Sequence, residues 1–220
     1  MSTIRYTLLC DGSSDRMLLP ILDWLLYQHS TEHAVESAWA DLGRLQQPPK
    51  TLPDKIIKTL DLYPCDILFI HRDAEKEPYA TRYSEITAAI EQLEMPPTIC
   101  VIPVRMQEAW LLFNEAAIRR AAGNPNGRNP LNLPSMKSVE TLPDPKESLF
   151  ALIRESSGLK GARLKKLNLH KRAFLVSQAI ADFSPLRTLY AFCALEEQVK
   201  RALTDNDFSS PLSASEKKAA

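Results

Sequence analysis

Along the first half of the chain, short continuous runs of apolar residues alternate with longer stretches in which apolar residues recur at helical spacing. The short runs contain β-branched and aromatic residues, which favours buried strands, and the longer stretches favour helices. Strands are expected at residues 4–10, 34–43, 66–71 and 98–104, and helices at 15–27, 51–63, 79–94 and 107–123. This alternation predicts an α/β fold with a mostly parallel four-stranded sheet and helices on both faces.

Two residues refine the expected helix boundaries. Pro20 lies early in the first helical stretch, where a proline kinks a helix or delays its start. Gly123 follows the last apolar position of the fourth stretch and is expected to close that helix.

The pattern changes after Gly123. Residues 124–146 are rich in Pro, Asn and Ser, which predicts an irregular surface connection. Further helices are expected at residues 145–157, 171–182 and 185–203. We therefore expect three parts, which are an α/β domain at 1–123, an irregular connection with a helical appendage at 124–203, and a disordered tail at 204–220.

Composition narrows the class of protein. Lys plus Arg and Asp plus Glu each number 27, so the overall charge indicates neither a nucleic-acid partner nor an acidic one. The four cysteines lie apart without a CxxC pair, which argues against structural zinc and a disulfide framework. No apolar run reaches the roughly 18 residues that span a bilayer, and the N-terminus lacks a signal-peptide pattern. A cytoplasmic protein without a membrane partner is expected.

Acidic residues follow three of the predicted strands. Asp11 and Asp15 lie in "CDGSSD" after the first strand, Asp73 and Glu75 in "HRDAE" after the third, and Glu108 follows the fourth. Parallel strands bring their carboxyl ends to one edge of a sheet, where these carboxylates could converge. Converging carboxylates raise each other's pKa and disfavour folding unless a cation neutralises them. Mg²⁺ or Mn²⁺, which prefer oxygen ligands, would be the natural cation, with Glu108 as a fifth ligand or a supporting acid.

Each acid also has a purely structural explanation. Asp11 and Asp15 can close a turn and stabilise a helix N-terminus, and the acids after the third strand can lie in a solvated loop. Glu108 can simply begin a helix. Taken jointly, their order along the expected fold favours a metal site. His29 and His33 are spaced i, i+4 but have no third ligand nearby in the sequence, so they do not predict a zinc site.

Three stretches, "CDGSSDRMLLPIL", "DILFIHRDAE" and "QEAWLL", occur in this order at the expected elements. They resemble the Toprim fold of topoisomerases, primases and overcoming-lysogenization-defect (OLD) nucleases, whose pattern is Glu-Gly-x-x-Asp on the first strand and Asp-x-Asp on a later one. The chain looks most similar to small Toprim-like bacterial proteins encoded beside ATPases in anti-phage defence loci. The resemblance covers about residues 4–115, and "DPKESL" and "FSPLRTL" are more loosely similar to the helical tail of that family.

The resemblance implies a nuclease in which magnesium or manganese polarises a phosphodiester bond. Asp73 and Glu75 would then hold the metal, Asp11 would bind the metal or act as acid or base, and Asp15 would orient the turn or complete the catalytic site. The sequence departs from the family pattern twice, because Asp11 replaces the usual Glu and Glu75 the second Asp. Each replacement keeps a carboxylate but changes its reach by one methylene.

Two functions follow from this resemblance. The first is a nuclease effector of an anti-phage defence system that acts on nucleic acid and works with an ATPase partner. The chain could also form a homo-oligomer. The second is a catalytically weak binding or regulatory subunit of such a complex, because both departures touch the acids. The sequence contains no Walker phosphate loop, so the chain itself is not expected to hydrolyse ATP.

Positive charge concentrates in residues 154–172, which contain seven Lys or Arg and one Glu. A basic stretch beside an acidic metal site suits a phosphodiester backbone. The candidate nucleic-acid contacts are Lys160, Arg163, Lys165, Lys166, Lys171 and Arg172, together with His71 and Arg72 beside the Asp73 acid. A solvated helix face or an acidic partner explains the basic stretch equally well, and His71 and Arg72 have an alternative as a structural histidine and a salt bridge. Few aromatic residues interleave with the basic stretch, so base stacking is not expected.

Overall fold

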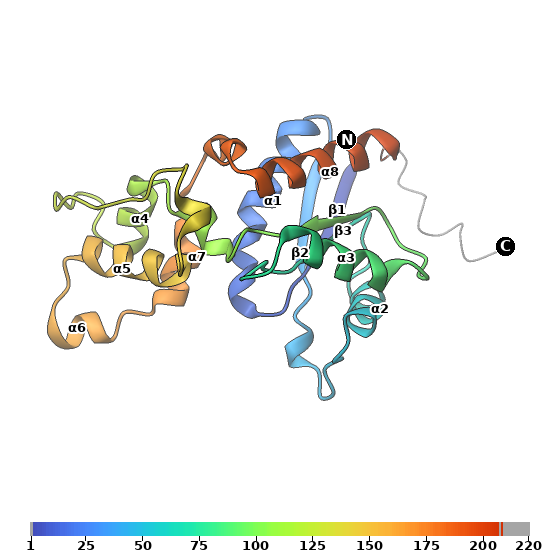
Figure 1. Cartoon of the computed structure of the whole chain (residues 1–220), viewed down its shortest axis with the longest axis horizontal. Coiled ribbons are helices and arrows are strands. Elements are labelled where there is room, and N and C mark those ends of the chain that lie inside the picture. The colour runs from blue at the N-terminus through green and yellow to red at the C-terminus, as the bar shows by residue number, and fades with distance from the viewer. Residues whose placement is uncertain (1, 207, 209–220) are drawn as a thin grey trace.

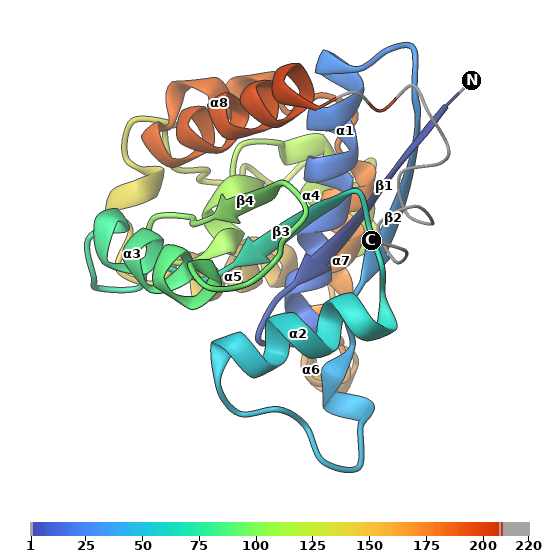
Figure 2. The same cartoon turned by 90° about the vertical axis from the view of Figure 1, so that its right-hand side faces the viewer.

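The computed structural model describes residues 2–206 and 208. Its strands are β1 (Thr3–Leu9), β2 (Ala34–Trp39), β3 (Ile67–His71) and β4 (Thr98–Val101). They form one sheet in the order β2-β1-β3-β4, and every neighbouring pair is parallel. The predicted α/β fold class is confirmed, and the ribbon views show helices on both faces of the sheet (Figures 1 and 2).

β3 lies inside the sheet, and all five of its residues are buried. Ile67 and Phe69 belong to one apolar core, whereas Leu68 and Ile70 belong to the other. This division follows from the strand period of two, which sends successive side chains to opposite faces. The continuous apolar run in the sequence therefore reflects a strand that is covered on both sides.

Two pairs of helices cover the sheet. On the face that carries Phe69 pack α1 (Leu19–His29) and α8 (Tyr190–Asp205), and on the opposite face pack α2 (Leu52–Leu62) and α3 (Tyr79–Ile90). Figure 2 shows α8 above the strands and α2 below them. The two layers hold the loops at the carboxyl ends of the strands in place.

Pro20 has the effect expected from the sequence. The turn after β1 continues into a 3-10 helix, η1 (Ser13–Leu18), and α1 begins only at Leu19, with the proline in its first turn. A proline is tolerated there because the first N–H groups of a helix have no intrahelical acceptor. The delayed start leaves η1 as the support of the loop that carries the first acids.

The prediction of a single helix at residues 107–123 is wrong. Two elements occupy this range, a 3-10 helix, η3 (Gln107–Leu111), and α4 (Glu115–Ala122). The Asn114 side chain accepts a hydrogen bond from the N–H of Ala117 at 2.9 Å, which satisfies a donor at the start of a new helix. Gly123 closes α4 as expected, in a left-handed conformation with φ of 83°.

The helices that follow differ in their boundaries from those expected. The expected helix at 145–157 is α5 (Pro145–Ser157), and that at 171–182 is α7 (Leu169–Ala179). Between them lies α6 (Gly161–Lys165), which the sequence analysis did not include. The helix expected at 185–203 is divided into a 3-10 helix, η5 (Ser184–Thr188), and α8. Two further 3-10 turns are η2 (Leu42–Arg44) and η4 (Val139–Thr141).

Helices α4 to α7 form a lobe beside the sheet, and α8 then returns to the sheet (Figure 1). Gln198 of α8 accepts a hydrogen bond from the N–H of Cys100 at 3.0 Å and donates to the Cys100 carbonyl at 3.4 Å, so its amide covers part of the β4 edge. The predicted tail at 204–220 lies outside the described residues, apart from residues 204–206 and 208. Within the described part of the chain, no helix is long and apolar enough to cross a membrane.

Candidate metal centre at the carboxyl edge of the sheet

The strand order creates a switch point between β1 and β3. From β1 the chain moves to β2 on one side, and it later crosses to β3 on the other side. The loops after β1 and β3 therefore diverge, and α/β proteins bind ligands in the crevice that such loops leave. Asp15 follows β1 and Asp73 follows β3, so both belong to this crevice.

Asp15 is buried and turned toward the loop after β4. One carboxylate oxygen accepts hydrogen bonds from the Gln107 side-chain amide at 2.5 Å and the Ser14 hydroxyl at 3.0 Å. The other accepts the N–H of Gly12 at 3.0 Å, which closes the turn after β1. Three donors thus hold this carboxylate, and no Lys or Arg pairs with it among the described residues.

Asp73 lies beside the same glutamine. Its carboxylate accepts a hydrogen bond from the backbone N–H of Gln107 at 3.0 Å and lies 3.5 Å from Nε2 of His71. Burial raises the pKa of Asp73 to about 6, and the negative charges of Asp15 and Glu75 act in the same direction. His71 and the Gln107 hydrogen bond only partly oppose this increase in pKa.

Glu108 is buried, like Asp15, and only 3% of its surface is exposed. Burial raises its pKa, and the charges of Asp73 and Asp15 raise it further. The nearest cation in the described residues is Lys146, whose Nζ is 3.9 Å from the carboxylate and lowers the pKa only in part. Asp15, Asp73 and Glu108 are called the acidic cluster below, and the surroundings of Asp73 and Glu108 disfavour the charged forms of these two acids.

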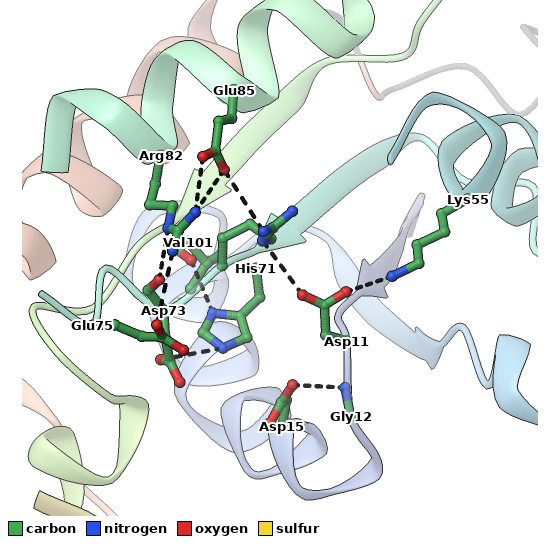
Figure 3. Close-up of polar contacts among 11 residues, drawn as sticks. Asp11, Gly12, Asp15, Lys55, His71, Asp73, Glu75, Arg82, Glu85 and Val101 are labelled. Atoms are coloured by element: carbon green, nitrogen blue, oxygen red, sulfur yellow. Dashed lines mark hydrogen bonds and ion pairs between the residues drawn. The ribbon is translucent and has the colours of Figure 1, made fainter. Parts of the chain in front are cut away.

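Asp11 and Glu75, called the rim acids below, lie near cations at the rim of this cluster, although the charge of Glu75 also raises the pKa of Asp73. Asp11 lies 2.6 Å from Lys55 Nζ, as Figure 3 shows, and 3.4 Å from the Arg72 guanidinium. Its partial burial would raise its pKa, but the Lys55 hydrogen bond and the charges of Lys55 and Arg72 outweigh this and lower it. Glu75 is mostly exposed and lies 3.9 Å from Arg82.

The backbone at Glu75 is unusual. Glu75 and Arg105 have φ values of 56° and 63°, and they are the non-glycine residues with positive φ in the described part of the chain. The N–H of Glu75 donates to the Arg105 carbonyl at 2.8 Å, so the two strained positions are bonded to each other. Strained conformations of this kind concentrate at functional sites, where the surrounding structure enforces them.

His71 and Arg72 have different surroundings. His71 is buried, and its Nδ1 lies 2.9 Å from the Val101 carbonyl, to which it donates, while Nε2 faces Asp73. Arg72 is partly exposed and reaches Asp11 and, at 3.7 Å, Glu85. Arg72 can therefore meet a ligand at the rim, whereas His71 lies within the acidic site.

Gln107 is the residue that the sequence analysis missed. Its side chain donates to Asp15 and its backbone N–H donates to Asp73, so it joins the loops after β1 and β3. Its side-chain oxygen is buried and has no hydrogen-bond partner in the described residues. The available signal was an amide next to Glu108 in "QEAW" at the end of a predicted strand.

No group of three or more His, Cys, Asp or Glu side chains is arranged to hold a metal ion among residues 2–206 and 208. The chemistry of the donors nevertheless suits a hard cation, because three carboxylates and the unpartnered Gln107 oxygen are all oxygen ligands. His29 and His33 are engaged separately, with Glu196 and Ser30 at 2.8 Å each.

The basic segment is divided by the fold. Lys160, Arg163, Lys165 and Lys166 belong to or flank α6, which lies at the end of the lobe away from the sheet (Figure 1). The Arg172 guanidinium donates to the Ala121 carbonyl at 2.9 Å and so ties α7 to α4.

Comparisons with known proteins returned no significant similarity, neither to a family model nor to a curated protein or a solved structure.

Proposed function

We propose that the chain is a Toprim-like nuclease that uses Mg²⁺ or Mn²⁺ to cleave phosphodiester bonds. The observation that carries the proposal is the acidic cluster, in which Gln107 joins Asp15 to Asp73 at the switch point of a parallel sheet and the charges of both acids act on the buried Glu108. A fold does not normally keep such groups together without a cation unless they serve a function. The order of the motifs along the chain supports the Toprim-like assignment.

Within this proposal, Asp15, Asp73, Glu108 and the side-chain oxygen of Gln107 would hold the metal. The bound metal would polarise the phosphodiester and stabilise the attacking and leaving oxygens. Gln107 fixes the relative position of Asp15 and Asp73 through its two hydrogen bonds. Lys55 and Arg72, which now pair with Asp11, lie at the rim where a phosphate group would approach. We also propose a role in bacterial anti-phage defence with an ATPase partner, which rests on the sequence resemblance.

A second candidate is a catalytically weak binding or regulatory subunit. The observation in its favour is that the rim acids, which replace the usual Glu and Asp, pair with cations of the protein itself. In this case the site would bind a metal or nucleic acid without efficient cleavage.

A cleavage assay separates the two candidates. The protein is incubated with single-stranded and duplex DNA and RNA, in Mg²⁺, in Mn²⁺ and in excess chelator. We expect cleavage that requires the metal and falls by at least about a hundredfold in Asp73→Asn, the effect of losing one strong electrostatic contact in the transition state. The matched control is Asp61→Asn, because Asp61 is an exposed acid of α2.

Full activity in chelator, or equal activity of Asp73→Asn and Asp61→Asn, would contradict the nuclease proposal. Metal-dependent binding of nucleic acid without cleavage, with and without a candidate ATPase partner, would favour the regulatory subunit instead.

A further inference from the structure

A groove of about 1310 Å³ lies next to the acidic cluster. The loops after β1 and β2 form one wall, and the first half of α7 forms the other. Small-molecule sites usually enclose about 300–1,000 Å³, so this groove is large enough for an extended ligand. It lies between the sheet and the helical lobe.

The groove carries more positive than negative charge. Arg16, Arg44, Lys55 and Lys171 line it, together with the acids Asp11 and Asp41. Asp41 pairs with Arg44 and Asp11 pairs with Lys55, which accounts for both acids. Arg16 and Lys171 form no ion pair with any described residue, so their charges can bind an anion.

Two aromatic residues from distant parts of the chain meet at Arg16. The guanidinium carbon of Arg16 lies 4.5 Å from the ring centroid of Phe174, on α7, and 6.0 Å from that of Trp39, at the end of β2. Both aromatic side chains are partly exposed and line the groove. Nucleic-acid bases stack on aromatic rings and on guanidinium planes, and unpaired cations beside them bind the phosphates.

The groove and the acidic cluster share one loop. Residues 11–14 line the groove, and the next residue, Asp15, points into the acidic cluster. Arg16 then points back into the groove. A ligand lying in the groove would therefore contact the same loop that carries Asp15 of the acidic cluster.

We propose that this groove binds a single-stranded segment of the nucleic-acid substrate. The inference rests on the proposed nuclease function and specifies its substrate, which would be unpaired strands or duplexes with unpaired ends. Stacking on Phe174 and Trp39 requires exposed base faces, and a duplex hides these faces between its own base pairs. Base stacking is not expected from the sequence alone, because only the tertiary structure brings these rings to the unpaired cations.

Binding is measured in excess chelator, so that no cleavage occurs, by fluorescence anisotropy of labelled probes. The probes are an oligodeoxythymidylate and an oligouridylate of about 15 nucleotides, within the usual site size of single-strand binders, and a duplex of equal length. We expect at least one single strand to bind about tenfold or more tightly than the duplex. The preference between the two single strands identifies the sugar that the groove accepts.

Three substitutions test the groove itself. Phe174→Leu and Arg16→Ala should each weaken single-strand binding by roughly five- to a hundredfold, the usual effect of losing a stacking contact. Lys171→Ala should weaken binding of all single strands and reduce the slope of log affinity against log salt by about one. The matched control is Lys137→Ala, an exposed lysine of the connection before α5 that lies outside the groove, which should leave both affinity and slope unchanged.

Thermal melting of each variant establishes that it is folded. Lys171→Ala changes an exposed side chain that lies outside the apolar core. Equal binding of single strands and duplex would overturn the proposal, as would unchanged affinity in both Phe174→Leu and Lys171→Ala. A larger loss in Lys166→Ala than in Lys171→Ala would also overturn it and assign binding to α6.

These outcomes are independent of the cleavage assay. Groove-dependent single-strand binding without metal-dependent cleavage would support the groove and reject the nuclease. If cleavage depends on metal but the groove variants change neither single-strand binding nor the cleavage rate, the nuclease proposal stands and the groove proposal is rejected.

Discussion

Asp73 and Asp11 follow neighbouring strands at the same edge of the sheet, yet their environments shift their pKa values in opposite directions. Burial beside Asp15 raises the pKa of Asp73 to about 6. Partial burial would raise the pKa of Asp11 too, but Lys55 and Arg72 lower it overall. A position at the end of a strand is therefore not enough to make an acid a metal ligand. The positive charge around Asp73 is too small to offset the effect of burial on its pKa, whereas Lys55 and Arg72 already neutralise Asp11.

The largest expected effect concerns magnesium binding. A ligand that binds only the native state stabilises it by about 2.7 kcal/mol at one hundred times its Kd. Asp73→Asn should lose most of the magnesium stabilisation that the wild type shows, and Asp11→Asn should keep most of it. Paired thermal melts with magnesium and with chelator measure this response.

Two results would change the comparison between cluster and rim. An undiminished magnesium response in Asp73→Asn would remove this residue from the ligands. A loss in Asp11→Asn as large as that in Asp73→Asn would show that Asp11 leaves Lys55 and joins the cluster when the metal binds.

Gln107 offers a second test, because it joins the cluster without adding charge. Gln107→Glu would place a fourth carboxylate there, and we expect it to lower the free energy of unfolding in chelator by about 1–3 kcal/mol. Magnesium should restore more stability to this variant than it gives the wild type. Gln107→Leu is the control, because it removes the bridge to Asp15 without adding charge. Equal magnesium responses of the two variants would exclude Gln107 from the metal site.

The smallest effects concern pH and have opposite signs for the two acids. The folded pKa of Asp73, about 6, lies above the unfolded value of about 3.9. The stabilisation from its bound proton is therefore full below about pH 4 and is lost as the pH rises through about 6. In chelator, Asp73→Asn should match the wild type near pH 4 and be more stable by roughly 2 kcal/mol at pH 7.

Asp11 should behave in the reverse manner. Its folded pKa is lowered, so its stabilisation is present above the unfolded value of about 3.9 and is lost as the pH falls through the folded value. Asp11→Asn should be less stable than the wild type at pH 7 by under about 1 kcal/mol, because the side chain is half exposed. Denaturant unfolding across this pH range measures both differences. Parallel profiles for the two variants would contradict the comparison.

Much of the fold could be predicted because local patterns reflect burial. The apolar run that became β3 indicates a strand covered on both faces, and its alternating side chains do belong to two cores. Pro20 predicted either a kink or a delayed start, and α1 shows the delayed start. The break at Asn114 was missed, because apolar residues continue on both sides of it and only the capping hydrogen bond divides the helix.

The candidate site was predictable only in part. The sequence places Asp15, Asp73 and Glu108 after strands, and parallel strands bring such positions to one edge. Which acids meet cations depends on side-chain packing, so the pairing of Asp11 with Lys55 and of Glu75 with Arg82 could not be predicted. Gln107 was missed because an amide has no charge, and its role arises only when three distant loops meet.

The sequence by itself determined the alternation of strands and helices and the order of the acids, because both depend on neighbouring residues and on the parallel rule. Only the tertiary structure decided which carboxylates lack cations and which are paired, because Lys55 and Gln107 reach their partners from distant segments. It also decided that Trp39 and Phe174 meet at Arg16, because the packing of α7 against η1 brings β2 and the helical lobe to the same groove. Electrostatic shifts and binding surfaces depend on distances in space, and these are set when the whole chain packs.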